Sequence, residues 1–277
     1  MNTRISFYTK PFERIKNYFD MIDLSVEYGF TSLEGFCFMD FEEPDEEKAK
    51  AVRAYADSKN ISFSCFSVFI NLVGEDADVM MDRLKGYARV AKILGSPYLH
   101  HTIANNFDNF EFADKNREVF FEKGIKAVRE IYDYAESIGI KTIYEEQGYI
   151  FNGVSSFGTF LDNVDREVGI VADVANIYQV GDNIIDFVKT YGNKVVHIHI
   201  KDITITSDNT SGFGLPTFDG RYMNAVPVGE GIVPIKEVMD LLEKSGYKGY
   251  YTLEEAAEGD DSTVINRSLE YINNQLQ

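Results

Sequence analysis

The chain has 277 residues, of which 44% are hydrophobic and 26% are charged, and its formal net charge is −18. The length and the ordinary hydrophobic content predict one globular domain spanning residues 1–277. So acidic a surface would repel phosphate backbones and anionic lipids, which argues against nucleic acid or a membrane as the main partner.

The start of the chain and its cysteine content bear on export and on disulfide bonding. Residues 1–10 contain no apolar run of signal-peptide length, and no stretch approaches about 18 consecutive apolar residues. The two cysteines, Cys37 and Cys65, are too few for a disulfide framework, so we expect two buried thiols. These features predict a soluble, cytoplasmic protein.

Short runs rich in β-branched and aromatic residues alternate with longer helical patterns along the chain. The runs that predict strands are Arg4–Tyr8, Ser32–Phe36, Ser62–Ser67, Tyr98–His101, Lys141–Glu145, Val168–Asp173, Val195–Ile200 and Tyr250–Glu254. This alternation is typical of βαβ units around a parallel sheet, and eight of them predict a (β/α)₈ TIM barrel. A doubly wound open sheet is the competing fold, but the glycine-rich turn typical of it follows none of these runs.

Helical periodicity is clearest in three of the intervening segments. Apolar residues recur at three- and four-residue spacing from Phe121 to Ile138, and Gly139 stands at the position of a C-terminal cap. A second helix is predicted from Pro234 to Gly246, with proline near its first turn. A last helix, at about Thr263–Asn274, would close the ring.

The segment Ile203–Val228 is long, irregular and rich in glycine, threonine, aspartate and serine. Because it follows the seventh strand, at the end where such barrels carry their sites, we predict an ordered functional loop. Arg221 within it could clamp a hydroxyl, carboxylate or phosphate group of a substrate, or could be an ordinary surface arginine. The turn Gly229–Gly231 could present amide groups to an anion, or could simply lead the chain into the next helix.

Side-chain alternation directs polar residues of two strands into the barrel. On the seventh strand the valine and isoleucines suit the helix-facing side, so His197, His199 and Lys201 point inward. We expect His197 and Lys201 to contact substrate, although hydrogen-bonded core histidines are an alternative. On the fourth strand either His100 or His101 must lean inward, and His101 is the candidate substrate contact.

Carboxylates follow the apolar runs of the fifth, sixth and eighth strands, namely Glu145-Glu146, Asp173 and Glu254-Glu255. Each alone could be a helix cap or a solvated loop charge. Three carboxylates converging with an inward histidine would repel one another unless a cation neutralised them. Oxygen ligands with a single nitrogen predict a divalent metal ion, Mn²⁺ first, with Mg²⁺, Co²⁺ or Zn²⁺ as alternatives. Spacing alone does not choose between the neighbouring glutamates of either pair.

These segments resemble the xylose-isomerase-like TIM barrels, which include the sugar (phosphate) isomerase/epimerase group. Residues 139–145, 168–176, 196–202 and 246–254 are similar to the fifth to eighth strands of that family. The most specific motif is His197-Ile-His199-Ile-Lys201-Asp202. The resemblance implies that the metal ligands are Glu145, Asp173, His199 and Glu254. It also implies a substrate contact at Asn176, where the ketose epimerases of the family commonly have histidine.

The function implied by the resemblance is that of a divalent-metal-dependent isomerase or epimerase of a small sugar or polyhydroxy-ketone. Glu145 and Glu254 would transfer a proton through an enediolate. A metal-dependent dehydratase of the inosose type is the alternative, because its first proton abstraction is the same. A non-catalytic sugar-binding barrel is less favoured, and four histidines are too few for the trinuclear zinc site of an apurinic-site endonuclease. The expected partner is a small carbohydrate, and relatives suggest a homo-oligomer.

Overall fold

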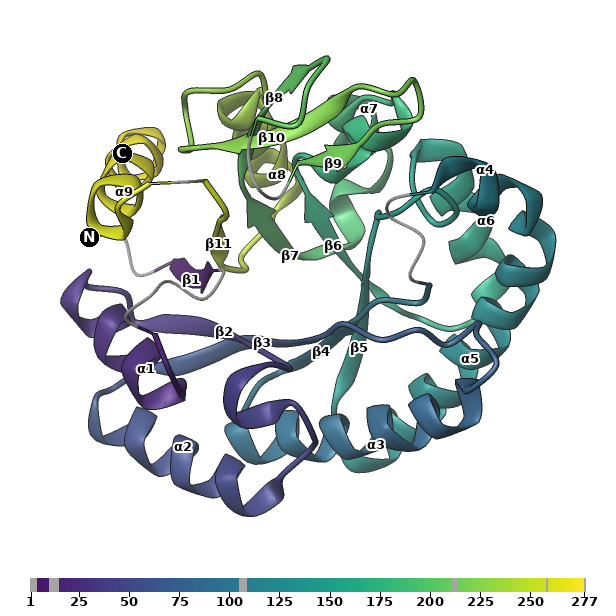
Figure 1. Cartoon of the computed structure of the whole chain (residues 1–277). Helices are drawn as coiled ribbons and strands as arrows, with labels where there is room; N and C mark the ends of the chain where they lie inside the picture. Colours follow the sequence, from purple (N-terminus) through teal and green to yellow (C-terminus); the bar gives the residue numbers. More distant parts are fainter. Residues whose placement is uncertain (1–3, 10–14, 105–108, 211–213, 258, 277) are drawn as a thin grey trace.

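The computed structural model describes residues 4–9, 15–104, 109–210, 214–257 and 259–276. Eight parallel strands close into a barrel in the order β1-β11-β7-β6-β5-β4-β3-β2 (Figure 1). The barrel strands are β1 (Ile5–Thr9), β2 (Ser32–Phe36), β3 (Ser62–Val68), β4 (Tyr98–His101), β5 (Lys141–Glu145), β6 (Gly169–Asp173), β7 (Val195–Ile200) and β11 (Tyr251–Glu255). The predicted (β/α)₈ fold is therefore confirmed, and each predicted strand lies within one residue of its observed bounds.

Helices surround the ring of strands (Figure 1). The α-helices of the described residues are α1 (Tyr18–Glu27), α2 (Glu46–Ser58), α3 (Ala77–Leu94), α4 (Phe110–Lys115), α5 (Arg117–Ile138), α6 (Val154–Val164), α7 (Ile184–Tyr191), α8 (Ile235–Ser245) and α9 (Asp261–Gln275). Short 3₁₀ helices are η1 (Met39–Phe41), η2 (Asn176–Val180) and η3 (Gly192–Lys194). The three predicted helices correspond to α5, α8 and α9. Gly139 ends α5 with φ +80°, a conformation that glycine adopts without strain.

Two layers of side chains lie above one another inside part of the barrel. The lower layer is a small apolar cluster of Cys65, Ile143 and Val171, separate from the main core. Two residues further along each of these strands comes a polar side chain, in turn Ser67, Glu145 and Asp173. Because strand side chains repeat every second residue, these polar groups share the inward face and lie nearer the carboxyl ends of the strands.

β7 divides its side chains as predicted. Ile198 and Ile200 belong to the main hydrophobic core. His197 and His199, which alternate with them along the strand, contact buried polar groups of the barrel interior. The strand therefore presents imidazole rings to the interior at two successive levels.

The segment after β7 is more regular than expected. Antiparallel strands β8 (Asp202–Thr206) and β10 (Tyr222–Val226) pair along five residues each, and β9 (Leu215–Pro216) adds a short third strand. Figure 1 shows this small sheet beside α7 and α8. The prediction of an irregular loop was wrong because alternating isoleucine and threonine at 203–206 favour a strand. Residues 211–213 of the predicted loop lie outside the described residues.

The two cysteines are free thiols. Cys65 is buried as expected, whereas Cys37 is only partly buried and its Sγ accepts the backbone N–H of Phe69 at 3.1 Å. Among the helices of the described residues, none is long and apolar enough to cross a membrane.

Asp202 ties the start of the small sheet to the chain that leads into α8. Its buried carboxylate accepts the backbone N–H groups of Ile203, Gly229, Gly231 and Val233 at 2.9–3.1 Å. The two glycine amides that could have formed an anion site therefore bind a carboxylate of the chain itself.

Removal of the Asp202 carboxylate should destabilise the fold. Because a buried amide without a partner costs about 1–3 kcal/mol, we expect Asp202→Ala to lower the free energy of unfolding by about 3 kcal/mol in denaturant titrations. Asp240 is a control, since its exposed carboxylate pairs with Lys236 on the helix surface, and D240A should cost less than about 0.5 kcal/mol. Similar small losses in both variants would contradict the anchoring role.

Candidate active site

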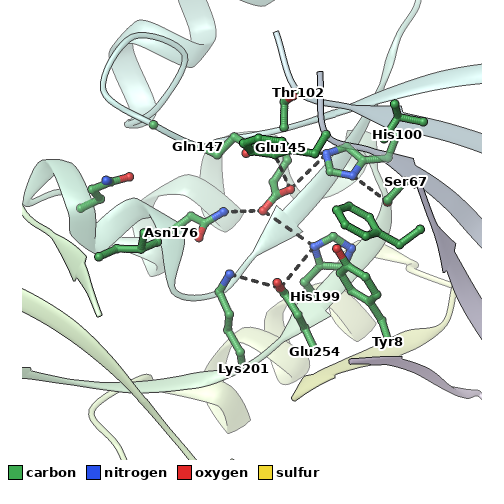
Figure 2. A pocket seen from close by; sticks show the side chains of 16 residues that line it. Tyr8, Ser67, His100, Thr102, Glu145, Gln147, Asn176, His199, Lys201 and Glu254 are labelled. Atoms are coloured by element: carbon green, nitrogen blue, oxygen red, sulfur yellow. Dashed lines mark hydrogen bonds and ion pairs between the residues drawn. The ribbon is translucent and has the colours of Figure 1, made fainter. Parts of the chain in front are cut away.

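Four neighbouring strands bring the predicted metal ligands together. Glu145 ends β5, Asp173 ends β6, and His199 and Glu254 stand one residue before the ends of β7 and β11. These strands are consecutive in the barrel, so the four side chains converge on one side of its mouth. Three of them line a cavity of about 190 Å³, in which Figure 2 shows Glu145 and Glu254 turned toward the ring of His199.

The donor atoms of these residues have a spacing that suits a divalent cation. Nδ1 of His199 is buried and has no hydrogen-bond partner among the described residues. It lies 3.6 Å from Oε2 of Glu254, 3.7 Å from Oε1 of Glu145 and 3.8 Å from Oδ2 of Asp173. Neighbouring ligands on a metal ion with bonds of about 2.1 Å lie about 3–3.5 Å apart. An imidazole nitrogen without a partner among three carboxylate oxygens therefore fits a metal centre.

Lys201 places a partly buried ammonium group beside two of these carboxylates. Its Nζ lies 2.7 Å from Oδ2 of Asp173 and donates a hydrogen bond to Oε2 of Glu254 at 3.1 Å. Burial lowers the pKa of Lys201, but the two carboxylates outweigh burial and hold the pKa above its ordinary value. The lysine predicted to contact substrate is thus a charged group that lines the cavity.

The surroundings shift the pKa values of the three carboxylates in different directions. Burial raises the pKa of Glu145, but the attraction of the nearby rings of His100 and His199 outweighs burial and brings the pKa below its ordinary value. Burial also opposes ionisation of Asp173, yet Lys201 and His199 hold its pKa below the usual range. For Glu254 burial outweighs the attraction of Lys201 and raises the pKa to about 8. The protein without metal therefore holds one ionised and one protonated glutamate at neutral pH.

Three side chains hold the carboxylate of Glu145 (Figure 2). Nδ2 of Asn176 donates to Oε1, Nε2 of Gln147 donates to Oε2 at 3.0 Å, and Nε2 of His100 lies 3.0 Å from Oε2. The backbone N–H of Asn176 also donates to Oδ1 of Asp173 at 2.9 Å. Asn176, predicted as a substrate contact, lines the cavity and also links two candidate ligands.

On β4 the inward histidine is His100, whereas the sequence analysis selected His101. The ring of His100 lines the cavity, and its Nδ1 lies 2.9 Å from Oγ of Ser67. His101 turns to the other side of the strand, where its Nε2 lies 3.0 Å from the hydroxyl of Tyr144 and the two rings pack edge to face. Alternation requires only one inward residue, and the short strand Tyr98–His101 offers no further pattern to choose between the two.

Two other predicted substrate contacts are not among the described residues that line the cavity. Arg221 is exposed, and its guanidinium pairs with Asp219 at 2.8 Å. His197 lies deeper in the barrel than His199, where its Nε2 lies 2.6 Å from Oε2 of Glu34. The structure therefore does not bring Arg221 or His197 to the site.

Glu34 is a buried ionisable residue of this region that sequence reasoning missed. It is fully buried within β2, and both carboxylate oxygens lie 3.1 Å from Nε2 of His199. A signal was present, because a lone glutamate inside the predicted buried strand Ser32–Phe36 needs a polar partner. Other residues that pattern reasoning did not find line the cavity, namely Tyr8, Phe36, Ser67, Phe69, Gln147, Gln179 and Leu215.

The neighbours of the two candidate catalytic glutamates point elsewhere. Glu146 is fully buried, its carboxylate oxygens have no hydrogen-bond partner among the described residues, and burial raises its pKa well above the ordinary value. Glu255 accepts hydrogen bonds from the backbone of Ala257 and the hydroxyl of Ser268. The register of β5 and β11 thus places Glu145 and Glu254, rather than these neighbours, at the cavity.

Comparison with known protein families gives the class to which this fold and site belong. Residues 22–275 match the model of the xylose isomerase-like TIM barrel family. The chain belongs to the xylose isomerase-like TIM barrel family, which confirms the resemblance found in its last four strands.

Individual relatives are distant. An inosose dehydratase of Bacillus cereus is 25% identical over 151 residues, so the match spans about half of this chain and half of that relative. D-psicose 3-epimerase from Clostridium cellulolyticum, solved with D-tagatose, superposes with a TM-score of 0.76 and 17% identity over 98% of this chain and 97% of that one. A xylose isomerase-like protein from Mycobacterium smegmatis, solved with magnesium, has a TM-score of 0.71 and 17% identity over 94% and 88%. At such identities the two solved structures show a shared fold.

The buried position of His101 predicts how stability changes with pH. Burial lowers the pKa of His101 to about 4, whereas an unfolded histidine has a pKa of about 6.5. Because the unfolded chain then takes up the proton first, the free energy of unfolding falls by about 2 kcal/mol from this residue between pH 7 and pH 5. His101→Gln, which lacks the titrating ring, should lose correspondingly less in urea titrations at both pH values. Equal losses in the two proteins would contradict a buried neutral histidine.

Proposed function

We propose that this chain is a divalent-metal-dependent isomerase or epimerase of a small sugar or polyhydroxy-ketone. The observation that carries the proposal concerns Nδ1 of His199, which is buried, has no hydrogen-bond partner in the part of the chain that the structure describes, and faces one oxygen from each of three carboxylates. The likeness to an inosose dehydratase and to a D-psicose 3-epimerase supports a sugar-modifying activity.

Glu145, Asp173, His199 and Glu254 would hold the metal ion. Three oxygen donors and one nitrogen suit Mn²⁺ first, with Mg²⁺, Co²⁺ or Zn²⁺ as alternatives. When bound, such an ion polarises a substrate carbonyl and an adjacent hydroxyl and acidifies the carbon-bound proton between them.

Two glutamates would move the proton. Glu145 on β5 removes it from carbon, and Glu254 on β11 returns it from the opposite face or to the neighbouring carbon. β6 and β7 separate these strands in the barrel, so the two carboxylates approach the cavity from different sides. Asn176 and Gln147 orient Glu145 through hydrogen bonds to its two oxygens. The ammonium of Lys201, bonded to Glu254, is placed to donate to a substrate hydroxyl.

The walls of the cavity also suit a small polyhydroxylated ring or chain. Phe36, Phe69 and Leu215 supply apolar surface, against which the C–H faces of a sugar can pack. Asn176 and Lys201 supply polar groups for its hydroxyls. A volume of about 190 Å³ leaves room for a single small substrate.

A dehydratase of the inosose type is the second candidate, favoured by the sequence match to an inosose dehydratase. It would share the metal site and the first proton abstraction by Glu145. The enediolate would then expel a β-hydroxyl instead of being reprotonated on carbon. Product mass separates the two reactions, because dehydration removes one water and isomerisation removes none.

Replacement of Glu254 by glutamine should abolish turnover while the protein stays folded. The change removes a proton carrier and a charged metal donor, and the proton carrier alone is worth about 10²–10⁴-fold in rate. Glu255→Gln is the matched control, because it makes the same change one residue away. The carboxylate of Glu255 accepts hydrogen bonds from the backbone of Ala257 and the hydroxyl of Ser268 instead of lining the cavity. Steady-state assays should show activity near wild type for E255Q. Near-normal activity in E254Q would contradict the assignment.

Metal-dependent hydrogen exchange should be detectable by proton NMR. We expect Mg²⁺- or Co²⁺-loaded protein in D₂O to introduce deuterium next to the carbonyl of at least one member of a panel of free and phosphorylated ketoses and inososes. With Co²⁺ the metal is chelated before recording, and metal-free protein is the control. The absence of exchange with every substrate, on protein shown to bind metal, would contradict proton abstraction from these substrates.

A further inference from the structure

Glu34 is a fully buried carboxylate to which three side chains of the barrel interior bond. Nε2 of His197 lies 2.6 Å from its Oε2, Nε2 of His199 lies 3.1 Å from both oxygens, and Oγ of Ser67 donates to Oε1 at 2.5 Å. Ser67 comes from β3, the neighbour of β2 in the barrel, whereas the two histidines come from β7, which is not adjacent to β2. The contacts of Glu34 with the histidines therefore cross the inside of the barrel.

These contacts are hydrogen bonds rather than a second metal site. Glu34, His197 and His199 are close enough to be considered as metal ligands. A separation of 2.6 Å between Glu34 and His197, however, is a hydrogen-bond length, whereas ligands of one metal ion lie about 3–3.5 Å apart. The carboxylate of Glu34 therefore accepts hydrogen bonds from its neighbours rather than binding a cation.

The bond to Glu34 determines which nitrogen of His199 faces the carboxylates of the mouth. Because Nε2 is turned to Glu34, Nδ1 is left without a partner among the described residues and points at the three candidate ligands. A carboxylate that accepts the second ring N–H of a metal-binding histidine fixes its tautomer and ring orientation.

The carboxylate of Glu34 is also connected to Glu145, through Ser67 and His100. Ser67 gives its single hydroxyl proton to Glu34, so its oxygen accepts from Nδ1 of His100, 2.9 Å away. Nε2 of His100 lies 3.0 Å from Oε2 of Glu145. A buried chain of contacts therefore runs from Glu34 to both His199 and Glu145.

We propose that Glu34 is a positioning residue of the metal centre, which orients His199 for coordination through Nδ1 and supports Glu145 through Ser67 and His100. This inference rests on the proposed metal-dependent function. It differs from that proposal in assigning a role to a side chain that touches neither metal nor substrate.

Zn²⁺ affinity, measured by competition with a chelator, tests the role of Glu34. Glu34→Gln keeps the size of the side chain but loses the charge, and should weaken binding by about 10- to 100-fold. Thr252→Val is the matched control, because it removes a buried hydroxyl that contacts His197 at 3.1 Å. T252V should bind within about threefold of wild type, and equal weakening in both variants would overturn the proposal.

Histidine NMR supplies a readout that general destabilisation would not reproduce. The chain has four histidines, so ¹⁵N labelling of their rings gives few signals to assign. In the Zn²⁺-loaded wild type we expect His199 to carry a proton on Nε2 at low field and to bind metal through Nδ1. That proton signal should shift or disappear in E34Q. Its absence from the wild-type spectrum would overturn the proposal without any variant.

The outcomes distinguish the two proposals. If the wild type does not bind Zn²⁺, the proposed metal centre is wrong. If wild type and E34Q bind equally and keep the same Nε2 signal, the metal centre stands and the role of Glu34 is wrong. Should E34Q fail to fold, Glu34→Asp retains the charge on a shorter side chain, and it too should bind at least about tenfold more weakly.

Discussion

Repulsion among closely spaced carboxylates is the constraint that organises the mouth of this barrel. Parallel strands bring Glu145, Asp173 and Glu254 into one small volume, and burial opposes the ionisation of each. β7 lies between β6 and β11, and the balancing groups are the imidazole of His199 on this strand and the ammonium of Lys201 directly after it. The strand order therefore places these cationic side chains between the carboxylates, and the remaining repulsion is the physical reason for proposing a divalent cation here.

Much of the fold could be predicted because its pattern is local. Strands and helices alternate, each with its own periodicity, so the number of strands and their approximate bounds follow from short windows of sequence. The inward face of β7 was equally clear, since isoleucines alternate with His197 and His199. The choice of Glu145 over Glu146 and of Glu254 over Glu255 came instead from family resemblance, because two adjacent glutamates leave the register open.

The parts that were missed depend on contacts between distant segments. His100 and His101 are adjacent and chemically identical, and only the pairing of β4 with β3 and β5 determines which one faces inward. Glu34 lies more than 160 residues from the histidines it contacts, so the sequence around it does not indicate which residues are its partners. Arg221 has the chemistry of an anion clamp, but Asp219 two residues away already occupies its guanidinium.

The small sheet and the barrel strands contribute different parts of the candidate site. β9 contributes Leu215 to the cavity wall, and Lys201, which also lines the cavity, directly precedes β8. The candidate metal ligands all lie on barrel strands outside this stretch. A substitution at Leu215 therefore changes the cavity wall but leaves the four candidate ligands in place, so selection can alter this wall without altering those residues.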